Sequence, residues 1–151
     1  MKTLVLGLGN TILTDDGIGI RVAQKIKERC KNVDVSEASA AGFRVIDEII
    51  GYDKLILIDS IKTGKSEPGK LHKFTFEEFK KTRHHAQPHD ISLFEAFEII
   101  KQHGDKLPSE IEIYAVEVSD TSTLSETCTM EVEASIPKIS QKIIDEQSLF
   151  K

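Results

Sequence analysis

The sequence is poor in cysteine and has no long apolar run. Cys30 and Cys128 are the only cysteines, and they lie far apart without a C-x-x-C pairing, so neither a disulfide framework nor a secreted setting is indicated. No stretch approaches the about 18 apolar residues of a membrane helix, and the amino terminus lacks the basic and apolar segments of an export signal. We therefore expect a cytoplasmic protein without membrane insertion.

An excess of positive charge is also absent. Lys and Arg number 20 against 25 Asp and Glu, the formal net charge is -5, and the basic residues are scattered along the chain. Nucleic acids and anionic membranes are therefore poor candidate partners. The 151 residues, 39% of them hydrophobic, contain no repeat or low-complexity linker, so we expect a single domain spanning residues 1–151.

Strands and helices are predicted to alternate in the first part of the chain. Short apolar or alternating runs predict strands at 3–8, 32–37 and 54–59. Apolar residues at helical spacing predict one helix through Ile18, Val22 and Ile26, and another over 43–50. The run at 54–59 is continuously apolar, which is typical of a central parallel strand covered on both faces.

The pattern changes after residue 61. Turn residues are followed by a lysine-bearing run over 70–76, which we expect to be an edge strand reached without a helix. A helix through Leu93 and Phe97, a strand over 111–118 and a last helix with Pro137 in its first turns or at a kink complete the chain. We predict an α/β fold, a three-layer αβα sandwich with an open, mostly parallel sheet of about five strands and one antiparallel edge strand.

Two carboxylates, Asp15 and Asp16, precede the first helix. Thr14 or Asp15 is expected to cap that helix, which leaves the second carboxylate to point across the top of the sheet. The preceding glycine loop lacks the third glycine of G-x-G-x-x-G, and the two acids would repel a pyrophosphate. A nucleotide-binding domain is therefore the weaker interpretation.

Asp59 and His89 complete a candidate site. Asp59 ends the most apolar strand, and ligands of open α/β sheets bind outside the carboxyl ends of the strands. His89 is expected on a loop at the amino end of the next helix. Two carboxylates and an imidazole with open coordination positions suit zinc or nickel better than calcium or magnesium. Asp16, Asp59 and His89 are therefore candidate metal ligands on loops at one edge of the sheet. The alternatives at this point are an acid that only favours the helix dipole at Asp16 and a solvated surface residue at His89, because spacing alone does not show that three distant segments converge.

Three segments together resemble a known family. They are Leu6–Gly19 (LGLGNTILTDDGIG), Leu55–Ile61 (LILIDSI) and Pro88–Leu93 (PHDISL). In order and spacing they are similar to the signature of hydrogenase maturation proteases, the nickel-dependent endopeptidases that process the large subunit of [NiFe] hydrogenases. The resemblance covers nearly the whole chain.

The resemblance implies a function for the site. Asp16, Asp59 and His89 would bind nickel already inserted in the precursor of the large subunit, whose carboxyl-terminal extension is then removed; Zn²⁺ or a similar divalent ion is expected to substitute in vitro. The sequence departs from the family where Asp16 replaces a frequent Glu, and where Glu37-Ala38-Ser39-Ala40 replaces an Asp-Gly-Gly-Thr turn. Glu37 is therefore a further candidate site residue.

Two roles for the metal are open. It can polarise the scissile carbonyl or activate a water, or it can dock the precursor while another carboxylate, such as Asp15 or Glu37, acts as general base. A rival from another class is a non-catalytic, nickel-sensing assembly factor that uses the same ligands without cutting the subunit.

Overall fold

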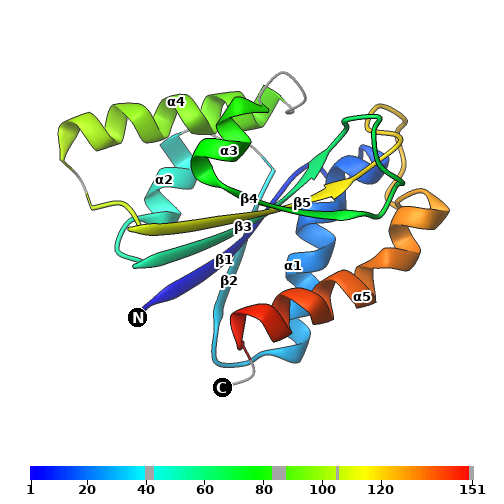
Figure 1. Ribbon diagram of the computed structural model, residues 1–151, viewed down its shortest axis with the longest axis horizontal. Coiled ribbons are helices and arrows are strands. Elements are labelled where there is room, and N and C mark those ends of the chain that lie inside the picture. The colour runs from blue at the N-terminus through cyan, green and yellow to red at the C-terminus, as the bar shows by residue number, and fades with distance from the viewer. Residues whose placement is uncertain (40–42, 83–87, 105, 150–151) are drawn as a thin grey trace.

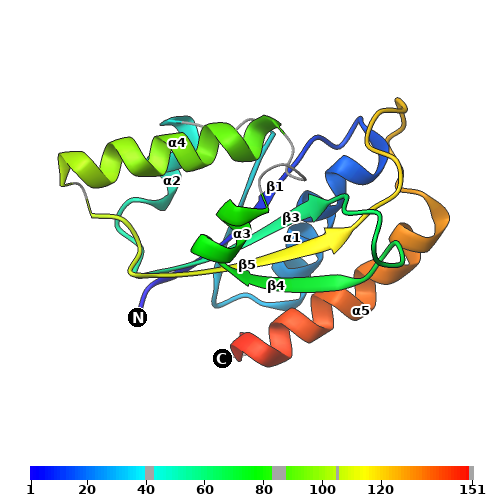
Figure 2. The same cartoon turned by 45° about the horizontal axis from the view of Figure 1, so that its top comes forward.

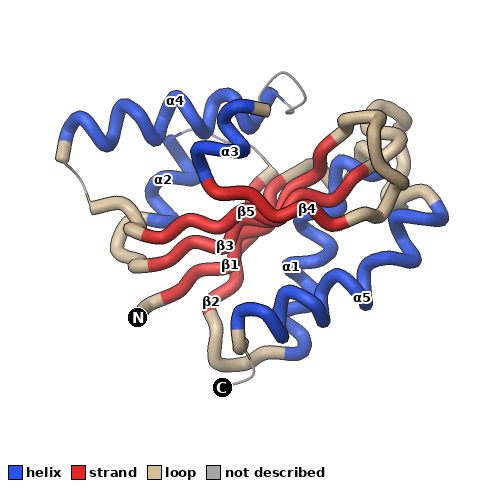
Figure 3. The backbone as a smooth tube through the Cα atoms, in the orientation of Figure 1, coloured by secondary structure: helices blue, strands red, loops and turns tan. Residues whose placement is uncertain are grey.

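A five-stranded sheet with helices packed on both faces forms the framework of the chain (Figures 1 and 3). The computed structural model describes residues 1–39, 43–82, 88–104 and 106–149, and the side chains of residues 43–44 and 88–93 lie outside that description. The strands are β1 (Thr3–Leu8), β2 (Asp34–Ala38), β3 (Lys54–Ile61), β4 (Leu71–Thr75) and β5 (Glu110–Glu117). The helices are a 3₁₀ turn η1 (Thr14–Gly17), α1 (Ile18–Arg29), α2 (Phe43–Ile49), α3 (Phe76–Lys81), α4 (Pro88–His103) and α5 (Met130–Gln147).

The strand order is β2-β1-β3-β5-β4, and every neighbouring pair is parallel except β4 with β5. Helices α1 and α5 cover one face, and α2, α3 and α4 cover the other (Figures 1 and 2). The predicted three-layer αβα sandwich with an antiparallel edge strand is therefore confirmed.

Two apolar cores follow from the alternation of side chains along each strand. In β3, Ile56 and Ile58 pack toward α1 and α5, whereas Leu55, Leu57 and Ile61 pack toward α2, α3 and α4. The same alternation decides where the polar residues at the end of β3 point. Position 59 falls on the face of α4, and position 60 falls on the face of α1.

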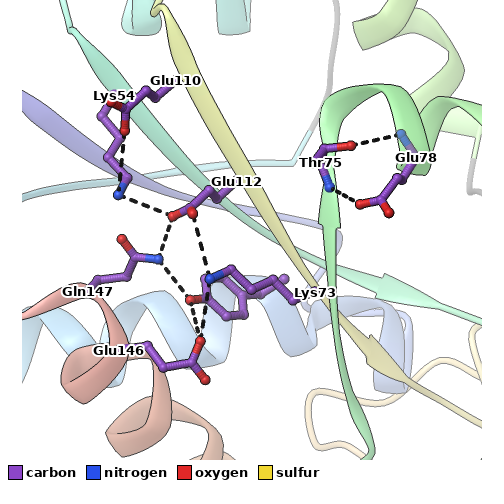
Figure 4. Close-up of polar contacts among 9 residues, drawn as sticks. Lys54, Lys73, Thr75, Glu78, Glu110, Glu112, Glu146 and Gln147 are labelled. Atoms are coloured by element: carbon purple, nitrogen blue, oxygen red, sulfur yellow. Dashed lines mark hydrogen bonds and ion pairs between the residues drawn. The ribbon is translucent and has the colours of Figure 1, made fainter.

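The predicted strand and helix bounds differ from the observed ones by no more than two residues. The most consequential difference is that β3 continues through Ile61, because Ser60 and Ile61 still pair with β5. Helix α3 was not predicted, although Thr75 and Glu78 form a capping box at its start, with the Thr75 hydroxyl accepting from the Glu78 amide (Figure 4). Pro137 lies in the interior of α5 rather than in its first turn.

Charged residues tie α5 to the amino edge of the sheet (Figure 4). The Lys73 ammonium lies 3.6 Å from the Glu112 carboxylate and 3.5 Å from that of Glu146, and Lys54 lies 3.1 Å from Glu112. This network leaves the opposite, carboxyl edge to the loops around Asp16 and Asp59. Over the ranges that the structure describes, no helix is long and apolar enough to cross a membrane.

Candidate functional site

The structure brings Asp16 and Asp59 together at the carboxyl edge of the sheet. Asp16 belongs to η1 and is 4% exposed, and Asp59 in β3 is fully buried. Ser60 links them, because its backbone amide donates to Asp59 Oδ1 at 2.8 Å and its hydroxyl to Asp16 Oδ1 at 3.4 Å. The two carboxylates thus contact the same buried serine, one through its amide and the other through its hydroxyl.

The two carboxylates approach this edge from opposite layers of the sandwich. Asp59 follows the alternation of Leu57 and projects toward α4, whereas Asp16 stands in the turn that leads into α1. Figure 2 shows the carboxyl ends of β3 and β5 pointing toward the loops that precede α1 and α5. The prediction that the site residues lie on loops is wrong in detail, because Asp59 is inside a strand and Asp16 is inside a 3₁₀ turn.

His89 is the second residue of α4, not a loop residue, and its side chain lies outside the described part of the structure. Helix α4 covers the same face of the sheet onto which Asp59 projects, through Phe94, Ala96 and Phe97. Among side chains that the structure describes, no three His, Cys, Asp or Glu are grouped to hold a metal ion. The three-residue metal site therefore stays a prediction.

Asp15 has a different environment from its neighbour. Its fully buried carboxylate accepts hydrogen bonds from the backbone amides of Ser119, Asp120 and Thr129 at 3.2, 3.1 and 2.7 Å, and from the hydroxyls of Ser119 and Thr129. It thus fastens the loop between β5 and α5 to η1. The expected capping by Thr14 or Asp15 is wrong, because the N-cap of α1 is Gly17 and no side chain caps it.

Glu37 is placed away from Asp59. It is exposed in β2, in register with Gly7, and its Oε2 accepts from Gln24 Nε2 of α1 at 3.1 Å. Gly7 in turn pairs with Ile58, which faces α1, so Glu37 lies on the opposite face of the sheet from Asp59. The structure does not bring Glu37 together with the two buried carboxylates.

Close packing explains Gly9, in the first loop, and Gly19, at the start of α1. A Cβ on Gly19 would stand 2.3 Å from the Ile58 carbonyl oxygen and 2.5 Å from that of Leu8, so α1 can approach the sheet only with glycine there. A Cβ on Gly9 would stand 2.1 Å from the Asp16 carbonyl oxygen. These contacts account for the glycine loop without a phosphate and fix the backbone that carries Asp16.

One buried carboxylate at this edge was missed. Glu117, at the end of β5, accepts from the Thr63 amide at 2.8 Å, the Thr63 hydroxyl at 2.6 Å and the Gly64 amide at 3.2 Å, and lies 3.3 Å from His72 Nε2. Burial acts to raise its pKa, but the hydrogen bonds from Thr63, Gly64 and His72 lower it below the usual range. An acid at the end of an apolar strand, as at Asp59, was the signal that could have found it.

The fold and this edge place the chain among open α/β-sheet proteins that hold functional groups at the carboxyl ends of their strands. Residues 20–146 match the model of the hydrogenase maturation protease family, HycI. The chain belongs to the hydrogenase maturation protease family and is a peptidase, as the resemblance of its three segments implied.

Individual relatives agree with this assignment. The chain is 28% identical to the hydrogenase 2 maturation protease of Escherichia coli (strain K12) over 120 residues, which cover 77% of this chain and 73% of the relative. The E. coli hydrogenase maturating endopeptidase HybD superposes with a TM-score of 0.86 at 25% identity, covering 98% of this chain and 93% of HybD. The [NiFe] hydrogenase maturation protease HybD from Thermococcus kodakarensis gives 0.81 at 25% identity, with 99% of each chain covered.

Proposed function

We propose that this chain is a nickel-dependent endopeptidase that removes the carboxyl-terminal extension of a [NiFe] hydrogenase large-subunit precursor after metal insertion. Asp16, Asp59 and His89 bind the nickel that the precursor presents. The observation that carries the proposal is the pair of buried carboxylates joined through Ser60 at the carboxyl edge, in a chain of this family.

The donor set fits a divalent transition metal. Carboxylate oxygens and a histidine nitrogen are ligands of nickel and zinc, and three protein ligands leave positions open for substrate. Once bound, the metal supplies Lewis-acid polarisation of a carbonyl or a water. The protein contributes fixed positions for two of the ligands, because Ser60 orients both carboxylates from the buried side.

A cleavage assay with two precursors tests the proposal. The chain is incubated with the nickel-loaded and the nickel-free large-subunit precursor from the same genome, and mass spectrometry follows loss of the extension. We expect cleavage of the nickel-loaded form alone. Equal cleavage of both forms contradicts nickel dependence, and binding without any mass loss points to the non-catalytic assembly factor.

Variants within one helix test the site. His89→Ala should abolish cleavage, whereas His103→Ala should leave it unchanged, because His103 is exposed at the far end of the same helix and its ring bonds to the Ile99 carbonyl of that helix. Asp59→Asn should abolish cleavage as well, since an amide is a much poorer metal ligand than a carboxylate. Full activity of His89→Ala would remove the imidazole from the proposed site.

A further inference from the structure

Large apolar side chains are exposed on the loops next to Asp16. Ile12, before η1, is 50% exposed; Leu124, in the loop between β5 and α5, is 76% exposed; and Met130, the first residue of α5, is 87% exposed. Exposed apolar groups gathered on neighbouring loops are a common mark of an interaction site, whereas single ones are ordinary.

These loops are held together rather than loose. The Ser125 amide donates to the Ile12 carbonyl at 3.0 Å, and the Thr14 amide donates to the Ser125 carbonyl at 3.1 Å. The Arg21 guanidinium of α1 donates to the carbonyls of Thr11 and Glu126, one from each loop. Figures 1 and 2 show the two loops side by side beyond the carboxyl ends of β3 and β5. Ile12 and Leu124 are therefore presented on a fixed frame.

An open groove lies beside them, between α1 and the start of α5. It has a volume of about 650 Å³ and is lined by Arg21, Cys128, Met130 and Glu133, among others. Glu126 and Glu133 line it and are exposed, whereas the Arg21 guanidinium is engaged by the two loop carbonyls. We name Ile12, Leu124, Met130 and this groove the docking surface; it is apolar at the rim and negatively charged along the groove.

The docking surface is continuous with the proposed site. Thr129, which precedes Met130, donates through its amide and hydroxyl to Asp15, and Asp15 is the neighbour of Asp16. Ile12 connects through Leu13, whose carbonyl accepts from the Asp16 amide at 3.0 Å. The loop that leads into the docking surface and the turn that holds Asp16 therefore belong to one hydrogen-bonded frame.

We propose that the docking surface binds a segment of the precursor polypeptide that carries apolar and basic side chains and leads to the scissile bond. This inference rests on the proposed function. Apolar side chains of the segment cover Leu124 and Met130, and its Lys or Arg residues face Glu126 and Glu133. Charge complementarity selects a basic segment over an acidic one. The substrate chain is the occupant that fits, because the loops of this surface are hydrogen-bonded to the turn that holds Asp16.

Paired double variants test the surface. Leu124→Ser with Met130→Ser removes its apolar rim, and Ile50→Ser with Ile99→Ser is the matched control, because these residues are 39% and 42% exposed and lie outside the surface. We expect the first pair to raise KM for the nickel-loaded precursor about tenfold or more with kcat unchanged, and the control to change neither. Glu126→Lys should raise KM in low salt and reduce its salt dependence.

Direct binding separates the two proposals. The dissociation constant of the precursor is measured by isothermal titration calorimetry for wild type and both pairs. Binding that is about tenfold weaker only in the Leu124/Met130 double variant supports docking. If no precursor is cleaved in the same experiments, only the proposed function fails. If KM and the dissociation constant of both double variants equal those of wild type, the docking proposal is overturned and the proposed cleavage still stands. A wild-type dimer that the rim variants convert to a monomer assigns the surface to a second copy and also overturns the proposal.

Discussion

Replacement of Asp15 by Asn should destabilise the protein strongly although it changes one atom. The carboxylate is fully buried and accepts the Thr129 amide on Oδ1 and the Ser119 and Asp120 amides on Oδ2. An asparagine can accept through one oxygen only. Whichever way the amide is turned, its NH₂ group faces at least one buried N–H group, which then has no acceptor.

The magnitude follows from those contacts. A buried amide left unpaired costs about 1–3 kcal/mol, and hydrogen bonds to a neutral acceptor are each about 1 kcal/mol weaker than those to a carboxylate. The sum predicts a loss of about 3 kcal/mol in the free energy of unfolding. For a chain of this size that corresponds to a fall in Tm of roughly 6–12 °C.

Urea unfolding followed by circular dichroism, with a thermal melt, measures the effect. Asp16→Asn is the matched comparison, because it is the same change one residue away, on a carboxylate that accepts from the Ser60 hydroxyl at 3.4 Å. We expect Asp15→Asn to lose clearly more stability than Asp16→Asn, and Asp16→Asn to lose cleavage at temperatures where it is folded. Equal stability of Asp15→Asn and wild type would refute the assignment of Asp15 as the anchor of the 119–129 loop.

Three further outcomes are expected. Gly19→Ala should lower the free energy of unfolding by about 2–3 kcal/mol, because the new Cβ meets the Ile58 carbonyl oxygen at 2.3 Å; an unchanged melt would contradict that close approach. Glu117→Gln should make the free energy of unfolding fall less steeply as the pH is lowered, measured by urea unfolding between about pH 3 and 7. The folded state depresses the pKa of Glu117, so its contribution is complete above the usual value of 4.5 and is lost as the pH falls through the folded-state pKa; an identical profile in the variant would count against this role. Cys30 and Cys128 should resist iodoacetamide in the native protein and react after unfolding, because burial raises both thiol pKa values, that of Cys128 to about 12; mass spectrometry showing rapid native labelling would contradict their burial.

The layers of the fold were predictable because β1, β3 and β5 are apolar runs, β2 alternates, and α1, α2, α4 and α5 carry apolar residues at helical spacing. The turn after residue 61 and the lysines at positions 70 and 73 identified the antiparallel edge strand. The missed helix α3 had a readable signal in Thr75 and Glu78, at the spacing of a capping box.

The candidate site was less accessible from the sequence. Asp59 could be selected because a carboxylate inside an apolar strand is unusual, and the same reasoning applied to Glu117 would have found it. The role of Asp15 could not be predicted, because its donors Ser119, Asp120 and Thr129 come from the other end of the chain. Local sequence favours a helix cap at such a position, and only the tertiary structure shows the distant loop.

The buried serine that touches both carboxylates has a wider consequence. Asp59 and Ser60 point into different layers of the sandwich, so the gap between the carboxylates depends on how the α1 layer is set against the α4 layer across the sheet. A core substitution far from the edge that shifts one layer by about an ångström would change that gap directly, a displacement large enough to cost on the order of 100-fold in a rate. The rate of cleavage at the proposed site is therefore sensitive to core packing. Variants selected only for thermal stability should be compared by whether they shift the α1 layer or the α4 layer.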